Sequence, residues 1–422
     1  MSDMHPPATR TDAGTPERVV YAKGGAAHGF FEVTDDVTPW TRARFLDGAG
    51  RRTPVFVRFS SVAGERGSAD SRRDPRGFAV RFYTEDGNYD LVGNNTPVFF
   101  IRDPHRFSDF VRSQRRRADT NLRDHDMQWE FWTRTPESAH QVTLLMTDRG
   151  TPRSWRTMHG YGGHTFMWVN RGGERFWIKY TLTTDQGIEN FTDSEATAMC
   201  AEDPDFHIRD LYTSIRSGDP PSWTVHVQVM AFEDAPGYRF NPFDITKVWP
   251  HGDHPLMRVG RLVLDRNPED YVAEVEKAAF EPANMVPGIG PSPDPMLQGR
   301  LFSYPDTHRY RIGPNYLQLP INRPIGAPSA EDEDAYHAGA EMERAASEPH
   351  RDDDDFVQAR ALWETVLSDA DRDHLVRNIA GHVAKGGTRE MQKRVVAYWC
   401  SVHPELGAGV ARALKLETVA AE

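Results

Sequence analysis

An arginine and a tyrosine stand four residues apart in the segment Arg300-Leu-Phe-Ser-Tyr304. On a helix, residues with this spacing lie on the same face, so the guanidinium of Arg300 would lie against the phenol of Tyr304. A guanidinium in that place stabilises the ionised phenolate, because opposite charges attract at short range. A phenolate is an anionic oxygen ligand that can bind ferric iron. The spacing therefore indicates that Arg300 can stabilise the phenolate of Tyr304, an oxygen that is able to bind ferric iron.

The composition is that of a globular chain. The 422 residues are 38% apolar and 27% charged, and their formal net charge of −12 gives no indication of a nucleic-acid or anionic-membrane partner. The dense basic run Arg115-Arg116-Arg117 is interpreted as a solvated helix face. Cys200 and Cys400 sit in no CxxC pattern, which argues against a disulfide framework and a zinc site. We find no signal-peptide pattern and no apolar run of about 18 residues, so we expect a soluble, cytoplasmic protein.

Short segments that alternate between apolar and polar residues recur along the first part of the chain and predict strands. The predicted strands are 55–60, 78–84, 97–101, 141–146, 164–170, 175–183 and 222–232. They lack regular helical crossovers, which favours an antiparallel barrel or sandwich. A helical signature begins at Asn267. From 356 to 414 the period is helical, with Ser368, Thr388 and Pro404 at helix starts.

These patterns indicate the α+β class and divide the chain into five segments. The predicted segments are a disordered tail at 1–15, a β-barrel domain at 16–265, a wrapping segment with Tyr304 at 266–321, a linker at 322–353 and a helical domain at 354–422. The linker is assigned from its charged and small residues, which can bury little surface.

Long motifs along the chain resemble those of the haem catalases. They are Pro16-Glu-Arg-Val-Val, Arg58-Phe-Ser-Ser-Val-Ala-Gly-Glu, Asp74-Pro-Arg-Gly-Phe-Ala-Val-Arg-Phe-Tyr-Thr, Gly93-Asn-Asn-Thr-Pro-Val-Phe-Phe, Gly162-Gly-His-Thr-Phe, Phe240-Asn-Pro-Phe-Asp, Val248-Trp-Pro-His and the segment around Tyr304. The resemblance covers about residues 15–325 and continues in the helical tail, which is similar to that of the monofunctional, small-subunit catalases. It implies a catalase-type antiparallel barrel with a wrapping segment, one haem b in each subunit, decomposition of hydrogen peroxide and a homotetramer.

On the proximal side of the haem, the resemblance implies that Tyr304 is the axial iron ligand. Asp294 and His164 match the residues that orient its partner Arg300. Other matches are arginines that bind the haem propionates, a histidine near them, and apolar side chains that pack over the haem or line its channel. They are Arg18, Arg58, Arg311, His308, Val20, Phe99 and Phe107, while Val62 and Asp74 match the residues that narrow the access channel. Arginine suits the propionates because its planar fork binds carboxylates bidentately.

On the distal side, Asn94 matches the amide that hydrogen-bonds peroxide, and Ser60 matches the hydroxyl that orients a catalytic histidine. The family keeps that histidine where this chain has Tyr21. An imidazole accepts and returns a proton near neutral pH, whereas a phenol with a pKa of about 10 is a poor base. The departure therefore predicts haem binding with impaired peroxide turnover. His28 is interpreted as a packed or exposed strand histidine and not as a substitute base.

Two further properties of the family are open for this chain. Few residues precede the matching region, whereas the family has a longer arm that interlocks a tetramer, so we expect either a tetramer or a dimer. Some family members bind NADPH. Residues that match parts of that site are His140, Arg149, Val248, Trp249 and His251, whereas Thr183 and His159 depart from it.

Three functions remain possible from these residues. The leading one is haem-dependent decomposition of hydrogen peroxide, slowed by Tyr21. The second is a haem oxidase, peroxygenase or hydroperoxide-rearranging enzyme with a small organic substrate, in which loss of the distal base suppresses peroxide cycling. The third is a non-enzymatic haem-binding protein, and the complete set of channel and proximal residues argues against it.

Overall fold

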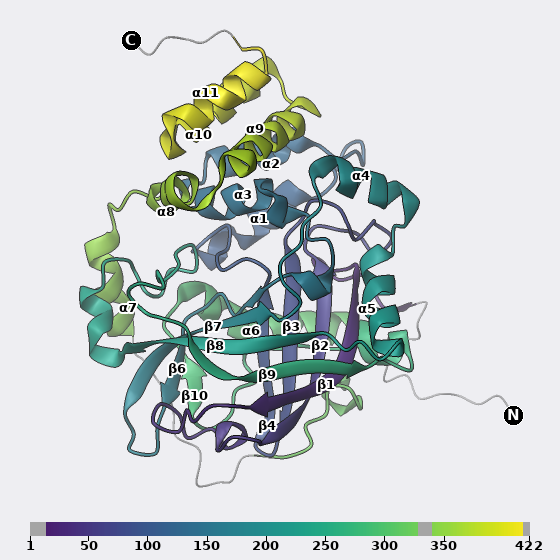
Figure 1. Cartoon of the computed structure of the whole chain (residues 1–422), viewed down its shortest axis with the longest axis vertical. Helices are drawn as coiled ribbons and strands as arrows, with labels where there is room; N and C mark the ends of the chain where they lie inside the picture. Colours follow the sequence, from purple (N-terminus) through teal and green to yellow (C-terminus); the bar gives the residue numbers. More distant parts are fainter. Residues whose placement is uncertain (1–13, 328–339, 417–422) are drawn as a thin grey trace, which may run out of the picture.

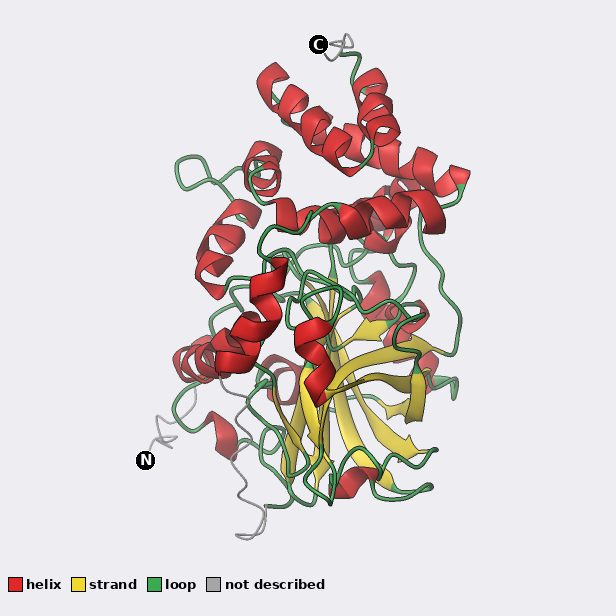
Figure 2. Cartoon of the chain, turned by 90° about the vertical axis from the view of Figure 1, so that its left-hand side faces the viewer, coloured by secondary structure: helices red, strands yellow, loops and turns green. Residues whose placement is uncertain are grey.

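The computed structural model describes residues 14–327 and 340–416. A β-barrel forms the lower part of the molecule in Figure 1, and helices gather above one end of it. Figure 2 shows the same arrangement from the side, with the strands in yellow and most of the helices in red above or beside them. None of the described helices is long and apolar enough to cross a membrane.

Eight antiparallel strands close into the barrel, so the predicted fold class is confirmed. The strands pair in the order β8-β9-β1-β2-β3-β4-β5-β7, and β7 pairs with β8 to complete the ring. Such closure leaves the ring without a free edge. The ring strands are β1 (Gly24–Val33), β2 (Arg52–Ser61), β3 (Arg76–Thr84), β4 (Gly87–Asn94), β5 (Gly160–Tyr161), β7 (Arg175–Thr184), β8 (Ser222–Ala231) and β9 (Met257–Arg266). Two short strands, β6 (Phe166–Val169) and β10 (Ile289–Pro291), extend the sheet beside β7.

Large aromatic side chains fill part of the barrel interior. Phe59 of β2 lies edge-on to Phe78 of β3, with ring centroids 4.7 Å apart, and stacks on Trp155 at 5.6 Å. Trp223 of β8 closes the group at 5.4 Å from Phe78. These rings join opposite parts of the wall, so the barrel is a packed core that holds the strand ends in fixed positions.

The helices form a second core above the barrel. The helices are α1 (Phe107–Gln114), α2 (His125–Thr133), α3 (Ala139–Met146), α4 (Asp193–Glu202), α5 (Phe206–Arg216), α6 (Pro295–Arg311), α7 (Ala340–Ser347), α8 (Val357–Ala361), α9 (Asp369–Ala384), α10 (Arg389–Val402) and α11 (Pro404–Ala413). Residues of α1 to α3 and α8 to α11 share one hydrophobic cluster. The three predicted helix starts are confirmed, since Ser368 and Thr388 cap α9 and α10 and Pro404 opens α11.

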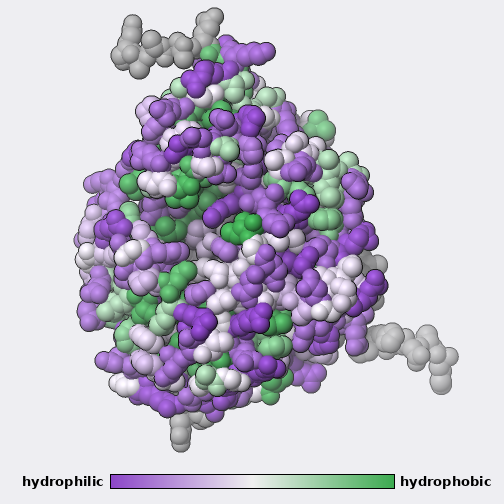
Figure 3. All heavy atoms as spheres, viewed as in Figure 1, coloured by the Kyte–Doolittle hydropathy of each residue, from purple (hydrophilic) through white to green (hydrophobic). Residues whose placement is uncertain are grey.

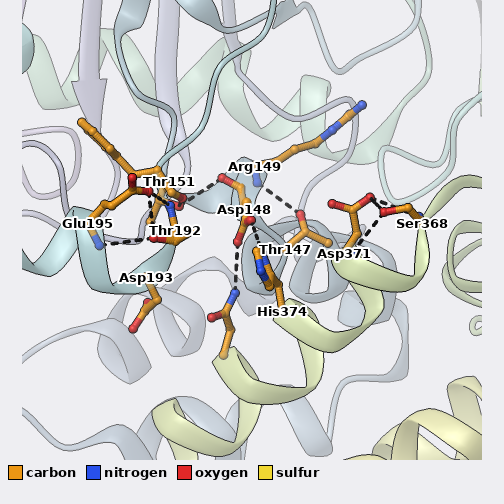
Figure 4. Close-up of polar contacts among 12 residues, drawn as sticks. Thr147, Asp148, Arg149, Thr151, Thr192, Asp193, Glu195, Ser368, Asp371 and His374 are labelled. Atoms are coloured by element: carbon orange, nitrogen blue, oxygen red, sulfur yellow. Dashed lines mark hydrogen bonds and ion pairs between the residues drawn. The ribbon is translucent and has the colours of Figure 1, made fainter.

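Polar contacts fasten α9 to the segment that follows α3 (Figure 4). His374 Nδ1 lies 2.6 Å from Asp148 Oδ2, and Asn378 donates to the backbone oxygen of Met146 at 2.9 Å. Asn378 is buried, so its amide needs this partner. The terminal helices are therefore held against the helices that leave the barrel.

Two predicted strands and part of the predicted linker are wrong. Residues 97–101 run as irregular backbone, and 141–146 belong to the helix α3, in which every side chain is buried. Polar and apolar residues alternate in Gln141-Val-Thr143-Leu as in a half-buried strand, but every side chain of this helix is buried, so the sequence shows no helical period. Within the linker segment 322–353, α7 packs against the barrel domain and buries Ala346 completely. The predicted tail at 1–15 lies outside the described residues up to 13.

Candidate functional site

Tyr304 and Arg300 lie on one face of α6, as their spacing predicts. Asp294 caps the start of this helix, because its Oδ1 accepts the backbone N–H groups of Met296 and Leu297 at 2.9 and 3.3 Å. Arg300 donates to the Tyr304 hydroxyl oxygen from Nε at 3.2 Å and from Nη2 at 2.7 Å. An oxygen that accepts two bonds from one guanidinium favours a negative charge. The geometry therefore suits Tyr304 as an anionic oxygen ligand.

A chain of buried polar side chains holds the guanidinium of Arg300 in place. Its Nη1 contacts His164 Nε2 at 2.8 Å, and His164 Nδ1 contacts Asp294 Oδ2 at 2.6 Å. A guanidinium only donates, so His164 Nε2 accepts and its Nδ1–H donates to the carboxylate of Asp294. Burial lowers the pKa of His164, Asp294 raises it, and Arg300 lowers it again, which agrees with this neutral tautomer. Arg300 Nη2 also donates to the Val92 backbone oxygen of β4 at 3.0 Å, so the barrel wall fixes the same group.

Arg18, Arg311 and Arg66 contact the carboxylate of Glu276, and Arg58 lies close enough for their charges to act on it. Arg18 Nη1 and Arg311 Nη1 contact the two oxygens of Glu276 at 3.0 and 3.1 Å, and Arg58 Nη2 donates to the Ala22 backbone oxygen at 3.2 Å. Burial, followed by the charge of Arg18, lowers the pKa of Arg58 and of Arg311 to about 9. Within the described residues Arg58 Nε is buried without a hydrogen-bond partner. An excess of buried positive charge with a free donor fits an anionic group that carries carboxylates, as the propionates of a haem do.

His308 lies one helical turn from Tyr304 and three residues before Arg311. Its ring is 6.1 Å from the Tyr304 ring, and its Nε2 donates to the Phe280 backbone oxygen at 2.9 Å. Burial lowers the pKa of His308 to about 4, so the imidazole is neutral at pH 7. Its Nδ1 has no hydrogen-bond partner in the described part of the chain. The predicted placement of His308 beside the arginines thus agrees with the geometry.

Tyr21 precedes β1, Ser60 lies near the end of β2 and Asn94 ends β4, and Gly77 of the intervening strand β3 lies against Ser60 and Tyr21. The Tyr21 hydroxyl donates to Asn94 Oδ1 at 3.1 Å, and the Tyr21 backbone N–H donates to the Val62 oxygen at 2.9 Å. A Cβ atom on Gly77 would lie 2.5 Å from Ser60 Oγ and 2.8 Å from Tyr21 Cδ1. Both side chains therefore pack directly on the bare backbone of Gly77. Among the described contacts, no hydrogen bond joins Ser60 to Tyr21.

The backbone holds Tyr21 in a strained conformation. Its φ is +64°, a left-handed value that few non-glycine residues adopt. Such strain costs of order 1–3 kcal/mol and persists only where the surroundings impose it. Burial raises the pKa of Tyr21, and the nearby Tyr304 raises it further. The charge of Tyr304 therefore acts on Tyr21, whose phenol stays protonated at neutral pH.

Apolar and aromatic side chains border this region. Phe99 is buried, with its ring 5.4 Å from Phe110, and Val20 packs against the same cluster. Phe107 begins α1, is 37% exposed and lies 6.3 Å from Phe110. Their contact with a haem stays a prediction.

His28 contacts Glu274 and Phe56 and makes no contact with the distal residues among the described hydrogen bonds and ring pairs. Its Nε2 lies 2.5 Å from Glu274 Oε2, and its ring packs 4.7 Å from Phe56. Burial lowers its pKa, so the side chain is a packed strand histidine, as we expected.

The residues that match a nucleotide site are divided between the barrel and the helices. His140 Nδ1 and Trp249 Nε1 are buried without hydrogen-bond partners among the described residues. The side-chain amide of Gln358 in α8 accepts a hydrogen bond from the Val248 backbone N–H at 3.0 Å and donates one to the Val248 backbone oxygen at 3.1 Å. NADPH binding stays a prediction.

Sequence reasoning missed Glu276 and Gly77. Glu276 is the carboxylate that Arg18 and Arg311 share, and it ends the short π-helix Tyr271–Glu276. Its signal was weak, because a glutamate in a charged segment usually points to solvent. Gly77 follows Arg76 in a motif that we identified, but only the structure shows how closely Ser60 and Tyr21 approach it.

A closed antiparallel barrel thus presents a guanidinium-bound phenol beside a group of buried arginines. The Catalase family model matches residues 9–353, and the Catalase-related immune-responsive model matches residues 349–414. The chain belongs to the catalase family, whose members are oxidoreductases that act on hydrogen peroxide.

Relatives from distant organisms agree with this assignment. The chain is 52% identical to a catalase of Methanosarcina barkeri over 95% of this chain and 86% of that protein. It is 50% identical to a catalase of Rattus norvegicus over 94% of this chain and 80% of that protein. A fungal catalase structure superposes with a TM-score of 0.88 at 43% identity, covering 95% of this chain and 88% of the other. A bacterial catalase structure gives a TM-score of 0.88 at 44% identity, with 96% and 88% covered.

The buried histidines predict how stability depends on pH. Burial lowers the pKa of His140 and of His308 to about 4, whereas an unfolded histidine titrates near 6.5. The unfolded chain binds these protons first, so each histidine contributes on the order of 1–3 kcal/mol above pH ~6.5 that is lost as the pH falls towards ~4. Burial raises the pKa of Asp70 to about 6, which opposes part of this loss.

Urea unfolding at a series of pH values between ~4 and ~6.5 measures how the free energy of unfolding changes with pH. His308→Gln keeps an N–H donor for the Phe280 oxygen and should flatten the slope. His105→Gln is the matched control, because the His105 side chain is 91% exposed. Equal slopes for His308→Gln and the unmodified protein would contradict the assignment.

Proposed function

We propose that this chain decomposes hydrogen peroxide with one haem b bound through Tyr304. The observation that carries the proposal is the combination of an Arg300-bound phenol with a separate group of buried arginines. A haem needs both, because its iron takes an axial ligand and its two propionates need cationic partners.

The bound haem supplies the redox-active iron, and the chain supplies the surroundings. Tyr304 would bind the iron, and Arg300, which donates two hydrogen bonds to its oxygen, would stabilise the phenolate. The arginines that would bind the propionates are Arg18, Arg58 and Arg311, with His308 beside them. Val20, Phe99 and Phe107 would pack against the porphyrin. Asn94 offers its amide to peroxide, and Ser60 offers a hydroxyl at the same strand ends.

We further infer that Tyr21 impairs this reaction. Peroxide cleavage needs a proton to move from one oxygen to the other. Burial raises the pKa of Tyr21, so its phenol is a still weaker base than free tyrosine. Its hydroxyl proton is also committed to Asn94 Oδ1. Turnover should therefore lie well below that of an enzyme with a distal imidazole.

The proposal also covers the subfamily, the cellular location, the assembly and a possible second cofactor of this chain. We place the chain in the small-subunit, monofunctional type, in the cytoplasm, as a homotetramer or dimer. Exposed apolar side chains in and after α6 support assembly, since Phe302, Tyr310 and Ile325 are 74%, 72% and 69% exposed. NADPH is a weaker proposal, because Thr183 and His159 depart from the residues that the family uses.

A haem enzyme for a small organic substrate is the alternative. The observation that favours it is the Tyr21 phenol, which can donate a hydrogen bond to an oxygen-containing ligand or lose an electron in one-electron chemistry. Such an enzyme would be an oxidase, a peroxygenase or a hydroperoxide-rearranging enzyme. No observation favours the non-enzymatic haem-binding function.

Replacing the proposed ligand tests the haem assignment. Tyr304→Phe should purify with little haem, because it removes the anionic oxygen that Arg300 stabilises. Arg300→Leu should shift the optical spectrum and lose less haem. Haem content and the absorption spectrum are the measurements, with Tyr310→Phe as a control at an exposed tyrosine of the same helix. Full haem occupancy with an unchanged spectrum in Tyr304→Phe would refute the assignment.

Restoring a distal base tests the role of Tyr21. Tyr21→His should raise the rate of oxygen evolution from peroxide by roughly 10²–10⁴, the usual contribution of a general acid–base group. Asn94 and Ser60 are already in place to orient the imidazole. Tyr83→His is a control at a tyrosine of the barrel wall. If the unmodified chain already evolves oxygen as fast as Tyr21→His, another group moves the proton.

Radical formation tests the alternative. If Tyr21 is redox-active, added peroxide should give a protein-radical signal and slow oxidation of a small aromatic donor. Both should decrease in Tyr21→Phe. Electron spin resonance and the donor-oxidation rate are the measurements. Equal radical yields and donor rates in the two proteins would exclude a redox role for Tyr21.

A further inference from the structure

Lys179 of β7 is a buried cation. Lysine side chains are nearly always exposed, and the face of the molecule in Figure 3 is largely hydrophilic. Lys179 is only 8% exposed, and its Nζ donates to the Gly163 backbone oxygen at 2.9 Å. In the described part of the chain, no carboxylate contacts this ammonium. Removing a charge from water without a contacting counter-ion is costly, so the surroundings must stabilise it in another way.

Trp249 and two more distant carboxylates stabilise this ammonium. The Nζ atom lies 5.6 Å from the centre of the Trp249 ring, whose face attracts a cation at that distance. Gln228 pairs with Lys179 across β7 and β8 and donates to the Trp249 backbone oxygen at 2.9 Å, which fixes that residue. Burial lowers the pKa of Lys179 to about 8, although the charges of Asp294 and Asp244 act in the opposite direction. Lys179 is therefore mostly a cation at pH 7.

The acceptor of Lys179 belongs to a tight turn that leads into His164. The His164 N–H donates to the Gly162 oxygen at 2.9 Å, which closes a three-residue γ-turn. Gly163, the central residue, has a φ of +74°, a left-handed value that favours glycine. The Gly162 N–H donates to the Tyr180 oxygen of β7 at 3.1 Å. The strand β7 therefore holds this turn twice, through the backbone of Tyr180 and through the side chain of Lys179.

The turn fixes the backbone of His164, whose ring orients Arg300. The ring nitrogens of His164 contact Arg300 Nη1 at 2.8 Å and Asp294 Oδ2 at 2.6 Å. Burial lowers the pKa of His164, and the charge of Lys179 contributes to this lowering. The same charge favours the ionised form of Asp294. Both effects support a neutral His164 whose Nδ1–H donates to Asp294 and whose Nε2 accepts from Arg300.

Asp294 depends on Lys179 more than Asp244 does. Asp244 Oδ2 contacts the guanidinium of Arg102 at 2.7 Å, and its Oδ1 accepts two further hydrogen bonds at 2.8 and 2.6 Å. Among the described contacts, Asp294 accepts from neutral donors, namely two backbone N–H groups of α6 and the ring of His164. A buried carboxylate without a contacting cation needs a positive charge nearby, and Lys179 supplies one.

We propose that Lys179 is a positioning residue for the axial ligand. Its ammonium holds the turn before His164 and keeps Asp294 ionised. His164 then presents Nε2 to Arg300, and Arg300 stays on the oxygen of Tyr304. The proposal deepens the proposed function and rests on it for the haem, whereas the contact of Lys179 with the turn does not depend on a haem.

Variants that separate the charge of Lys179 from its packing test the proposal. Lys179→Met keeps most of the volume without the charge, and Lys179→Gln also keeps an N–H donor for the Gly163 oxygen. The Fe(III)/Fe(II) reduction potential of the holoprotein is the first measurement. Both neutral variants should shift this potential to lower values, because a nearby positive charge is lost and a phenolate with weaker hydrogen bonds donates more electron density to the iron. Lys179→Arg keeps the charge and should retain the potential of the unmodified protein. Lys393→Met, at an exposed lysine of α10, is the matched control.

The crystal structure of Lys179→Met gives a readout that needs no haem. The contact between His164 Nε2 and Arg300 Nη1 should be lost in this variant and kept in Lys393→Met. Thermal unfolding of each variant checks that it is folded.

Three results would overturn the proposal. These are an unchanged potential in both neutral variants, a contact between His164 and Arg300 that persists in Lys179→Met, and a potential in Lys179→Arg as low as in Lys179→Met. If Tyr304→Phe keeps its haem with an unchanged spectrum, the proposed function fails. Loss of the His164–Arg300 contact in Lys179→Met would still support the positioning role in that case.

Discussion

The contact between Arg300 and Tyr304 depends on keeping a guanidinium immobile inside the protein. Without such restraint, the long side chain of Arg300 would sample several rotamers and extend its guanidinium towards water. Here His164 accepts from one nitrogen and Asp294 fixes the histidine tautomer. Asp294 also caps α6, so one carboxylate both starts the helix and orients the group that acts on Tyr304. The start of the helix and the position of the guanidinium against the phenol oxygen are therefore determined together.

The barrel is what makes this arrangement rigid. Arg300 donates to a backbone oxygen of β4, and Asn94, at the end of the same strand, holds the Tyr21 hydroxyl. Both phenols are thus linked to β4. Tyr304 is linked through the guanidinium of Arg300, and Tyr21 is linked through the side-chain amide of Asn94. A closed sheet with an aromatic interior deforms little, so the two sides of the site keep their relative positions. Glu276 compensates part of the charge of the buried arginines beside it, and the anionic group proposed for this site would compensate more.

The sequence predicted the parts whose signal is local. The four-residue spacing gave the contact between Arg300 and Tyr304, and the capping residue Ser368 gave the start of α9. The fold class followed from the alternating strands together with the resemblance to a family. The segment 141–146 was misassigned because complete burial removes periodicity. Glu276 was missed because its role depends on arginines that are distant in the chain, and no local pattern carries that information.

The surroundings of Tyr21 restrict its backbone conformation and the orientation of its ring. A φ of +64° is imposed by the flanking backbone, which is tied to Val62 on one side and leads into β1 on the other. The bare backbone of Gly77 gives a flat surface on which an aromatic or heteroaromatic ring can lie. These constraints act on the backbone and on the ring plane, and not on the identity of the polar atom. The position can therefore hold a phenol where the family resemblance implies an imidazole. A phenol whose pKa is raised by burial donates a hydrogen bond and accepts a proton poorly.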